Sequence, residues 1–392
     1  MLYWLIVVVV AAAAGHVVFW ASVVNRTHGL GIPRRTIDAI TVASAVMMAG
    51  VPLAIAAVFW KWATVDATWG GPLVWIAVWA YLGAMAACAI YAVVNHLWRV
   101  LHHERRGALV GNHTTRVDLR SSASGPLAAS GVPALIAHLP LNEVFDLHVR
   151  QKRIVLPRMT AELPALRIAH ISDLHMSGRI QREYFKLAVD EVNRLEPDLI
   201  AITGDLVDRE ACIDWMPETL GQLRAPAGVY FVRGNHDRRV RQEPLLAMLA
   251  DLGLVHLGGS CREISTHGMS ITLAGNELPW FGAAPKEQDL PPRAADGLPL
   301  RILLAHGPDQ FRWACDHDFD LMLAGHNHGG QVRVPLLGAI VAPSLSGTRY
   351  ACGVYRRGNT VLHVSRGTGS LTPIRWNCPP EIALLELGPA NS

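Results

Sequence analysis

The stretch Leu199–Thr203, LIAIT, followed by Gly204-Asp205-Leu206-Val207-Asp208, decides the fold. A short apolar run rich in β-branched residues is typical of a strand that is buried on both faces. Directly after it come a glycine and two carboxylates, so the strand ends in a polar turn. In layered α/β folds, ligands bind where the carboxyl ends of strands meet their loops. This stretch therefore predicts an α/β fold with a polar site at the edge of a sheet.

The same arrangement occurs four more times along the chain. Apolar runs end at Ser172-Asp173-Leu174-His175, at Gly234-Asn235-His236-Asp237, at His306, and at Gly325-His326-Asn327-His328. Residues 181–195 have helical periodicity and are followed by Pro197, so strands alternate with helices as in an α/β protein. Taken alone, each cluster is ordinary turn chemistry, because Gly, Asn and Asp favour turns. Five in order, each behind a strand, favour one shared site.

The order D-x-H, G-D-x-x-D, G-N-H-D, a lone His, then G-H-x-H resembles the calcineurin-like metallophosphoesterase superfamily. The run GHNHGGQ, which begins at Gly325, and the later Val364-Ser365-Arg366-Gly367 resemble its bacterial branch of membrane-associated phosphodiesterases. The resemblance covers roughly residues 146–388. It implies an α/β fold in which a layered β-sandwich is flanked by helices, the metallophosphoesterase fold.

The resemblance also implies two divalent metals, which would clamp the attacking and leaving oxygens of an in-line displacement. The first metal would be bound by Asp173, His175, Asp205 and His328, and the second by the bridging Asp205 with Asn235, His306 and His326. We expect the D-x-H and H-x-H segments to be extended, because alternate side chains of a strand point the same way. Carboxylate, amide and imidazole ligands suit Mn²⁺, Fe or Zn²⁺, and we expect Mn²⁺ to support activity in vitro.

His236 matches the family residue that stabilises the phosphoryl oxygens and protonates the leaving alkoxide as a general acid. Asp208 resembles the carboxylate that orients this His, so its loss should cost less activity than loss of His236. Arg209 could bind a phosphate oxygen, or it could be a solvated surface residue. Asp237 could be a helix N-cap or a turn residue.

Residues outside the motifs have plainer interpretations. His170, within the run Leu166–Ile171, is interpreted as a core residue with satisfied hydrogen bonds. His102-His103, beside Glu104-Arg105-Arg106, is interpreted as an interfacial helix end rather than a second metal site. Trp280, Trp313 and Trp376 could line a substrate pocket, but core packing is the favoured interpretation for each.

The N-terminal part of the chain is predicted to be a membrane anchor. The chain has 51% hydrophobic and 17% charged residues, whereas about 25% is charged in an ordinary soluble protein. The apolar excess lies in the first hundred residues, where three stretches (about 2–24, 37–60 and 72–98) are long enough to cross a bilayer. Residues 1–106 are therefore predicted to be an anchor with three transmembrane helices, and the lipid bilayer is a predicted partner.

Arginines on either side of these stretches predict the orientation. Arg26, Arg34 and Arg35 lie near the first loop, and Arg99, Arg105 and Arg106 follow the third stretch, whereas the second loop offers only Lys61. The positive-inside rule then places the N-terminus outside and the C-terminal domain in the cytoplasm. The six widely spaced cysteines form no C-x-x-C motif and are interpreted as reduced thiols. These observations predict an integral membrane protein, and the resemblance to the bacterial branch implies that the membrane is a bacterial inner membrane.

Residues 107–145 are predicted to link the anchor to the catalytic domain, which would occupy residues 146–392. Ser121-Ser122-Ala123-Ser124-Gly125-Pro126 is typical of a flexible loop. The next stretch, residues 127–141, is apolar, but it is short and contains Pro133 and Pro140. It could lie on the membrane surface and is too short to be a fourth span.

Together these features predict a membrane-anchored phosphoesterase that hydrolyses phosphodiester or phosphomonoester bonds by in-line attack of a metal-bound hydroxide. The anchor suggests a lipid-linked or amphiphilic phosphate substrate. The alternative from another class is a catalytically silent membrane sensor or scaffold on the same fold, since fold alone does not fix function. No basic, aromatic-rich tract accompanies the motifs and the net charge is only +3, so nucleic acid is not an expected partner.

Overall fold

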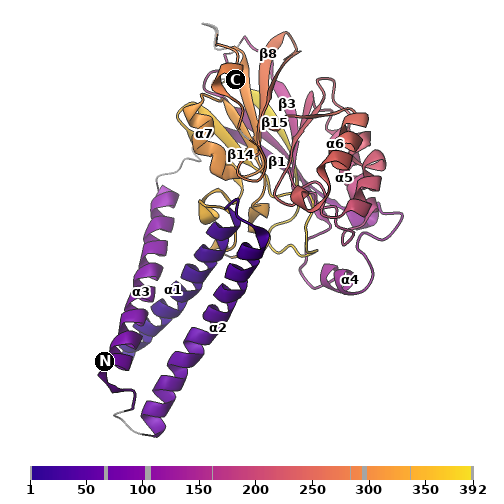
Figure 1. Cartoon of the computed structure of the whole chain (residues 1–392). Coiled ribbons are helices and arrows are strands. Elements are labelled where there is room, and N and C mark those ends of the chain that lie inside the picture. Colours follow the sequence, from indigo (N-terminus) through magenta and orange to yellow (C-terminus); the bar gives the residue numbers. More distant parts are fainter. Residues whose placement is uncertain are drawn as a thin grey trace. The chain divides into compact units, whose positions relative to one another are not determined.

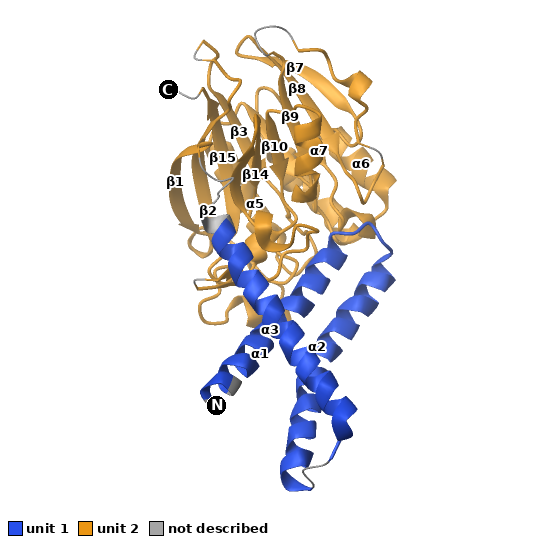
Figure 2. Cartoon of the chain, turned by 90° about the vertical axis from the view of Figure 1, so that its left-hand side faces the viewer, with its two compact units in different colours: residues 1–103 blue, residues 104–392 orange. Residues whose placement is uncertain are grey.

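The computed structural model of the chain describes residues 2–65, 69–101, 107–160, 162–282, 284–293, 298–335 and 337–389. The chain divides into two compact units, residues 1–103 and residues 104–392 (Figure 2). His102, His103, Glu104, Arg105 and Arg106, interpreted above as an interfacial helix end, lie outside the described residues.

The first unit contains three long helices: α1 (Leu2–His28), α2 (Arg34–Thr64) and α3 (Gly71–Leu101). Each contains a stretch that is long and apolar enough to cross a membrane, namely Ile6–His28, Arg34–Thr64 and Gly71–Trp98. His16 of α1 connects the other two helices, because its Nδ1 is hydrogen-bonded to the Tyr81 hydroxyl and its Nε2 lies 3.0 Å from the Met48 carbonyl oxygen. The three predicted helices are confirmed, each a few residues longer than predicted.

The second unit contains two large sheets flanked by helices (Figure 1). The first sheet has the strand order β1-β2-β15-β3-β4-β5-β6 and the second has the order β13-β14-β10-β9-β8-β7, while β11 and β12 form a separate pair. The strands are β1 (Leu109–Asp118), β2 (Asp146–Val155), β3 (Leu166–Ile171), β4 (Leu199–Thr203), β5 (Val229–Val232), β6 (Leu254–His256), β7 (Cys261–Thr266), β8 (Met269–Asn276), β9 (Leu300–Ala305), β10 (Leu321–Ala324), β11 (Arg333–Val334), β12 (Gly338–Ala339), β13 (Gly353–Arg357), β14 (Thr360–Val364) and β15 (Glu381–Gly388). The helices are α4 (Val132–Ala137), α5 (Arg182–Arg194), α6 (Gln242–Asp251) and α7 (Phe311–Asp316).

Apolar side chains hold these layers together. One buried cluster lies between the sheets and includes Ile168, Ala201 and Leu323. A second cluster joins the outer face of the first sheet to α5 and α6, and a third joins the second sheet to α7. The prediction of a layered β-sandwich flanked by helices, preceded by an apolar helical region, is confirmed.

A polar cluster crosses the core between the sheets. Lys152 forms an ion pair with Glu381, and its Nζ lies 2.8 Å from Nε2 of His363. Nδ1 of His363 lies 2.7 Å from Nδ1 of His170, whose Nε2 lies 2.8 Å from the Thr203 hydroxyl. If Lys152 donates to His363, each ring in turn donates to the next group, and every ring nitrogen is satisfied. The interpretation of His170 as a satisfied core residue is therefore confirmed.

Residues 107–145 differ from the predicted linker. Residues 109–118 form β1, which pairs antiparallel with β2 from Leu109↔Ile154 to Asp118↔Asp146. The second unit therefore begins before residue 109 rather than at residue 146. β1 is an edge strand with mostly exposed side chains, so its sequence, LVGNHTTRVD, lacks the apolar alternation by which a half-buried strand is recognised.

Candidate metal centre

The five predicted polar clusters meet in one place. Strands β3, β4 and β5 are parallel neighbours in the first sheet, and β9 and β10 are parallel neighbours in the second. The two sheets are joined at their carboxyl ends, where Nδ1 of His306 lies 2.7 Å from the Thr203 carbonyl oxygen. The backbone N–H of His326 donates to Oδ1 of Asp173 at 2.9 Å. Residues more than 150 positions apart in sequence thus share one buried site.

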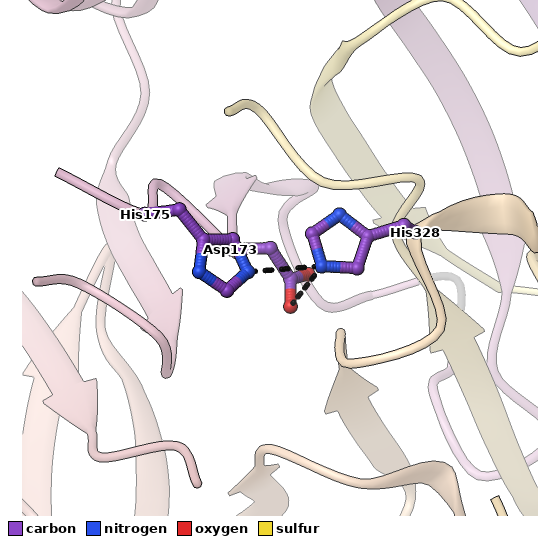
Figure 3. A group of neighbouring side chains, drawn as sticks. All are labelled: Asp173, His175 and His328. Atoms are coloured by element: carbon purple, nitrogen blue, oxygen red, sulfur yellow. Dashed lines mark hydrogen bonds and ion pairs between the residues drawn. The ribbon is translucent and has the colours of Figure 1, made fainter. Parts of the chain in front are cut away.

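Asp173, His175 and His328 form the first group of potential ligands (Figure 3). Their ligating atoms all lie within 4.8 Å of one another. Nε2 of His175 lies 3.0 Å from Nε2 of His328, and the latter lies 3.7 Å from Oδ1 of Asp173. These are three of the four residues predicted for the first metal, and the fourth is Asp205.

Asp205, His306 and His326 form the second group, and a third combination joins His236 to His175 and Asp205. Nε2 of His306 lies 3.3 Å from Oδ2 of Asp205, 3.1 Å from Nδ1 of His326 and 3.1 Å from Oδ1 of Asn235. The same Oδ2 of Asp205 is 3.5 Å from Nε2 of His175. One carboxylate oxygen therefore lies between both groups, as a bridging ligand would.

The chemistry of these groups fits divalent cations. In each group, lone pairs of imidazole nitrogens face one another and a carboxylate oxygen at a buried point. In the second group, Nδ1 of the buried His326 and Nε2 of His306 lie 3.1 Å apart, and Nε2 of His306 also faces a carboxylate oxygen of Asp205 at 3.3 Å. Oxygen and imidazole ligands without thiolate suit Mn²⁺, Fe or Zn²⁺.

The carboxylates control the protonation of these imidazoles. Burial opposes the charge on His306, but the nearby Asp205 outweighs it and raises the pKa of His306 to about 9. Burial, and then the charge of His175, hold the pKa of His328 well below its ordinary value. Asp205 therefore favours positive charge on His306, whereas burial favours the neutral form of His328, the form in which an imidazole can bind a cation.

The backbone of the ligand segments is not extended, so that prediction is wrong. Asp173, His175, Asp205, His326 and His328 all have φ between 48° and 71°. This left-handed region is uncommon for non-glycine residues and clusters at functional sites. In the D-x-H and H-x-H segments two left-handed residues flank one of negative φ, and this alternation brings both side chains to the same site.

Close backbone approach also shapes the centre. A Cβ added to Gly234 would lie 2.2 Å from Oδ1 of Asp205 and 2.8 Å from Cε1 of His306. No side chain fits at that position without displacing a predicted ligand. The glycine of the G-N-H-D motif thus lets two strand ends come together.

Asp208 holds three groups at the rim of the centre. Its Oδ1 lies 2.6 Å from Nδ1 of His236 and accepts from the guanidinium of Arg239, while its Oδ2 lies 2.9 Å from Nδ1 of His175. Burial would raise the pKa of Asp208, but the hydrogen bonds from His175 and His236 hold it well below its ordinary range. The carboxylate is therefore charged at any working pH, and it orients one predicted ligand as well as the predicted general acid.

Arg239 was not identified from the sequence. Its Nη2 lies 3.3 Å from Nε2 of His236. The residues after His236 form a 3₁₀ turn, Asp237–Arg239, in which side chains three positions apart eclipse. The three-residue spacing from His236 to Arg239 could have indicated this contact, but only if the residues after His236 were known to form a 3₁₀ turn.

Asp237 and Arg209 differ in how they relate to the centre. Asp237 is fully buried and accepts backbone N–H groups of Leu206, Val207 and Gly234 at 2.9, 3.0 and 2.7 Å. Asp237 thus connects the turn after β5 to the turn after β4. This position agrees with the interpretation of Asp237 as a turn residue. Arg209 is exposed beside Gly178, and phosphate binding by it stays a prediction.

The three tryptophans lie in different environments. The Trp280 ring centroid lies 5.3 Å from that of His306 and 4.8 Å from that of His326, so it packs against two predicted ligands. Trp313 stacks on His317 inside the unit. Trp376 is 43% exposed, so the expectation of core packing is wrong for this residue.

Comparisons with known proteins agree with this architecture. Residues 166–330 match the calcineurin-like phosphoesterase family. Phosphodiesterase YaeI of Escherichia coli is 34% identical over 226 residues, which cover 56% of this chain and 82% of that protein. The chain belongs to the calcineurin-like phosphoesterase family.

Two further relatives support the assignment. The uncharacterized metallophosphoesterase YkuE of Bacillus subtilis is 30% identical over 275 residues, 69% of this chain and 94% of that protein. The UDP-2,3-diacylglucosamine pyrophosphatase LpxG of Chlamydia muridarum is 26% identical over 283 residues, 59% of this chain and 86% of that protein. The resemblance stated from the motifs is confirmed, and this phosphoesterase is a phosphoric ester hydrolase.

Proposed function

We propose that this phosphoesterase is anchored in a membrane and uses two divalent cations to hydrolyse a phosphodiester or phosphomonoester bond of an amphiphilic substrate. The observation that carries the proposal is the position of Asp205, whose Oδ2 lies 3.5 Å from His175 and 3.3 Å from His306. One carboxylate serving two groups of ligands is the arrangement that a two-metal site requires. The three apolar helices and the name of LpxG, a pyrophosphatase of a diacylated sugar nucleotide, support an amphiphilic substrate.

Cations held there would stabilise charge on the phosphoryl oxygens and activate the attacking water. Asp173, His175, Asp205 and His328 would hold one cation, and Asp205, Asn235, His306 and His326 the other. Mn²⁺ is the metal that we expect to support activity.

The residues beside this centre handle the proton of the leaving group. The Nδ1 atom of His236 faces Asp208, so its Nε2 can present a proton to the leaving oxygen. Burial lowers the pKa of His236 despite the nearby carboxylates, which makes the charged ring a stronger acid. Arg239, 3.3 Å from Nε2 of His236, supplies positive charge where a phosphate oxygen would lie.

The test measures hydrolysis by the detergent-solubilised full chain after metal stripping and readdition of Mn²⁺. The substrates are p-nitrophenyl phosphate and bis-p-nitrophenyl phosphate, and Asp205→Ala and His236→Ala serve as comparison variants. We expect metal-dependent turnover that both variants lose, with the preferred substrate separating monoesterase from diesterase. A folded chain that binds no Mn²⁺ would overturn the proposal and favour the silent scaffold.

We further propose that the protein resides in a bacterial inner membrane with its second unit in the cytoplasm. With three helices that each cross the membrane, Arg26, Arg34 and Arg35 would be on the same side as the second unit, and positive residues favour the cytoplasmic side. A reporter fused at the C-terminus should be active only in the cytoplasm, and a periplasmic signal would reverse the orientation.

A further inference from the structure

Exposed apolar side chains of the second unit are concentrated in a few segments. Its exposed large apolar residues are Leu109, Val110, Val132, Leu135, Leu139, Leu141, Leu337, Val341, Leu345 and Trp376. Between residues 142 and 336, none of the described large apolar side chains is exposed. Single exposed apolar residues are normal, but a concentrated patch marks an interaction surface. We call the exposed residues of 132–141 and 337–345, with Trp376, the apolar rim.

The segments of the apolar rim are connected to one another. Nδ2 of Asn142 donates to the Pro373 carbonyl at 2.8 Å, and Oδ1 of Asn142 accepts from the Arg375 N–H at 2.9 Å. These bonds fix the end of 132–141 beside Trp376, whose own N–H donates to the Gln331 carbonyl at 3.1 Å. A Cβ added to Gly330 would lie 2.4 Å from Cβ of Ala339, so the segment 337–345 packs on the same turn. α4 is carried on a loop that stands off the layered core (Figure 1).

The rim also borders the metal centre. His328 lies two residues before Gly330, and Nη1 of Arg375 donates to the His328 carbonyl at 3.2 Å. In the segment 337–345, the Ser344 hydroxyl donates to Asp309 at 2.8 Å. Asp309 lies three residues after His306. Both rim segments are thus attached to turns that carry predicted ligands.

The charge pattern of the rim points to lipid. Residues 121–142 and residues 334–348 contain no Asp, Glu, Lys or Arg. Charged side chains are costly where a surface enters the apolar part of a bilayer, whereas the border of a protein–protein interface is polar and tolerates them. Two exposed, charge-free and apolar segments therefore fit insertion into a membrane surface.

The chain length between the units permits this contact. α3 has 31 residues and is about 46 Å long, about 16 Å more than the hydrocarbon core of a bilayer. From Leu101 to Leu109 the chain can span a further distance of about 27 Å. The rim lies beyond the opposite end of β1, a strand of 10 residues that is about 30 Å long. The part of α3 that exceeds the hydrocarbon core and the chain from Leu101 to Leu109 are together longer than β1. The rim can therefore reach the surface of the membrane in which the helices sit.

We propose that the second unit binds the lipid bilayer through the apolar rim, so that the metal centre, whose turns carry the rim segments, lies next to the lipid surface. The contact with lipid stands independently of catalysis. Its consequence rests on the proposed function: an amphiphilic substrate reaches the centre with its phosphate while its alkyl chain remains in the bilayer.

The first experiment detects the contact without using activity. The full chain is reconstituted into nanodiscs that contain phosphatidylcholine, phosphatidylglycerol and a phospholipid with a diazirine in its acyl chain. After irradiation, labelled peptides are identified by mass spectrometry. We expect label in the peptides that carry residues 132–141 and 337–345, and none in β6 or β7. Label confined to the three helices, or to residues 109–110, overturns the proposal.

The second experiment tests the consequence. The variant Leu135→Glu/Leu141→Glu/Leu337→Glu changes side chains that are 70%, 76% and 66% exposed. Its matched control is Leu109→Glu/Val110→Glu, at the opposite end of β1. Rates are measured on hexadecyl p-nitrophenyl phosphate in vesicles and on methyl p-nitrophenyl phosphate in solution, which share a leaving group.

We expect the ratio of the vesicle rate to the solution rate to fall at least tenfold in the rim variant and to stay unchanged in the control. An unchanged ratio in the rim variant, or an equal fall in the control, overturns substrate access through the rim. If the unsubstituted chain hydrolyses neither diester, substrate access through the rim and the diesterase form of the proposed function both fail, and the labelling result still decides the lipid contact.

Discussion

Replacing Asp208 by Asn should weaken metal binding as well as catalysis. The carboxylate accepts from Nδ1 of His175 through Oδ2 and from Nδ1 of His236 through Oδ1. An amide of the same shape has only one acceptor oxygen, so one imidazole would face an NH₂ group and lose its orientation. A charge-assisted hydrogen bond contributes about 1.5–3 kcal/mol, and 1.36 kcal/mol corresponds to a factor of ten. If the bond to His175 is lost, we expect Mn²⁺ affinity to fall about 10- to 150-fold, close to the loss of about 10- to 100-fold that is typical of residues that orient metal ligands.

Comparison with His236→Gln separates the two roles of Asp208. His236 is not among the predicted ligands, so His236→Gln should leave Mn²⁺ affinity within about twofold and lower kcat about 10²- to 10⁴-fold through loss of the general acid. Asp208→Asn should lower kcat less than His236→Gln and should alone reduce the affinity. Glu210→Gln is the control, because Glu210 is an exposed carboxylate two residues away that pairs with Arg241.

The assay is calorimetric titration of Mn²⁺ into the metal-stripped, detergent-solubilised chain, followed by steady-state rates at saturating Mn²⁺. Equal Mn²⁺ affinity for Asp208→Asn and the unsubstituted chain would refute the reasoning, because Asp208 would then not position His175. Reduced affinity in His236→Gln would also contradict it, because that result would make His236 a ligand.

Three further predictions follow from packing and burial. Gly234→Ala should abolish Mn²⁺ binding, because its Cβ would lie 2.2 Å from Oδ1 of Asp205. The measurement is titration of Mn²⁺ into a variant whose circular dichroism spectrum is unchanged. Normal Mn²⁺ affinity would contradict the prediction. Lys152→Met should destabilise the fold by about 3–5 kcal/mol, because it removes the buried lysine that pairs with Glu381 and leaves this carboxylate only the more distant Arg366, at 3.7 Å. Urea unfolding measures the loss, and an unchanged free energy of unfolding would contradict the prediction. Burial, and then the charge of Lys152, lower the pKa of His170 to about 3, so between about pH 6.5 and pH 3 the unfolded chain binds a proton that the folded chain does not. Stability should therefore rise with pH in this window, and His170→Gln should flatten the slope by up to about 1.4 kcal/mol per pH unit; an unchanged slope in urea unfolding would argue against it.

The strands predicted between residues 166 and 324 are buried on both faces, whereas the exposed strand β1 was missed. The runs Leu166–Ile171 and Leu199–Thr203 are strands with the predicted bounds, and the apolar runs that end at Gly234 and Gly325 are the strands Val229–Val232 and Leu321–Ala324. Parallel strands covered by other layers are continuous apolar runs, so their ends are marked by the first polar residue. β1 has no such mark, because it lies at the sheet edge and most of its side chains are exposed.

The centre was predictable in composition but not in conformation. Residue type and order placed Asp173, His175 and their partners at strand ends, because metal chemistry demands those side chains. The left-handed backbone of the ligands was not predictable, since non-glycine residues adopt it only when surrounding contacts impose it. The link from Asp208 to His175 depends on those same turns, and so does the position of Arg239.

The contacts that impose this conformation come from the neighbouring strand ends. The N–H of Asp173 donates to the Gly204 carbonyl at 3.0 Å, and the N–H of His326 donates to Oδ1 of Asp173 at 2.9 Å. The N–H of His236 donates to Oδ1 of Asp205 at 2.7 Å. Each strained residue costs about 1–3 kcal/mol, and each is tied to a turn that belongs to another strand. The carboxylates are therefore acceptors for the backbone as well as predicted ligands, so hydrogen bonds of the chain itself support the conformation of the centre.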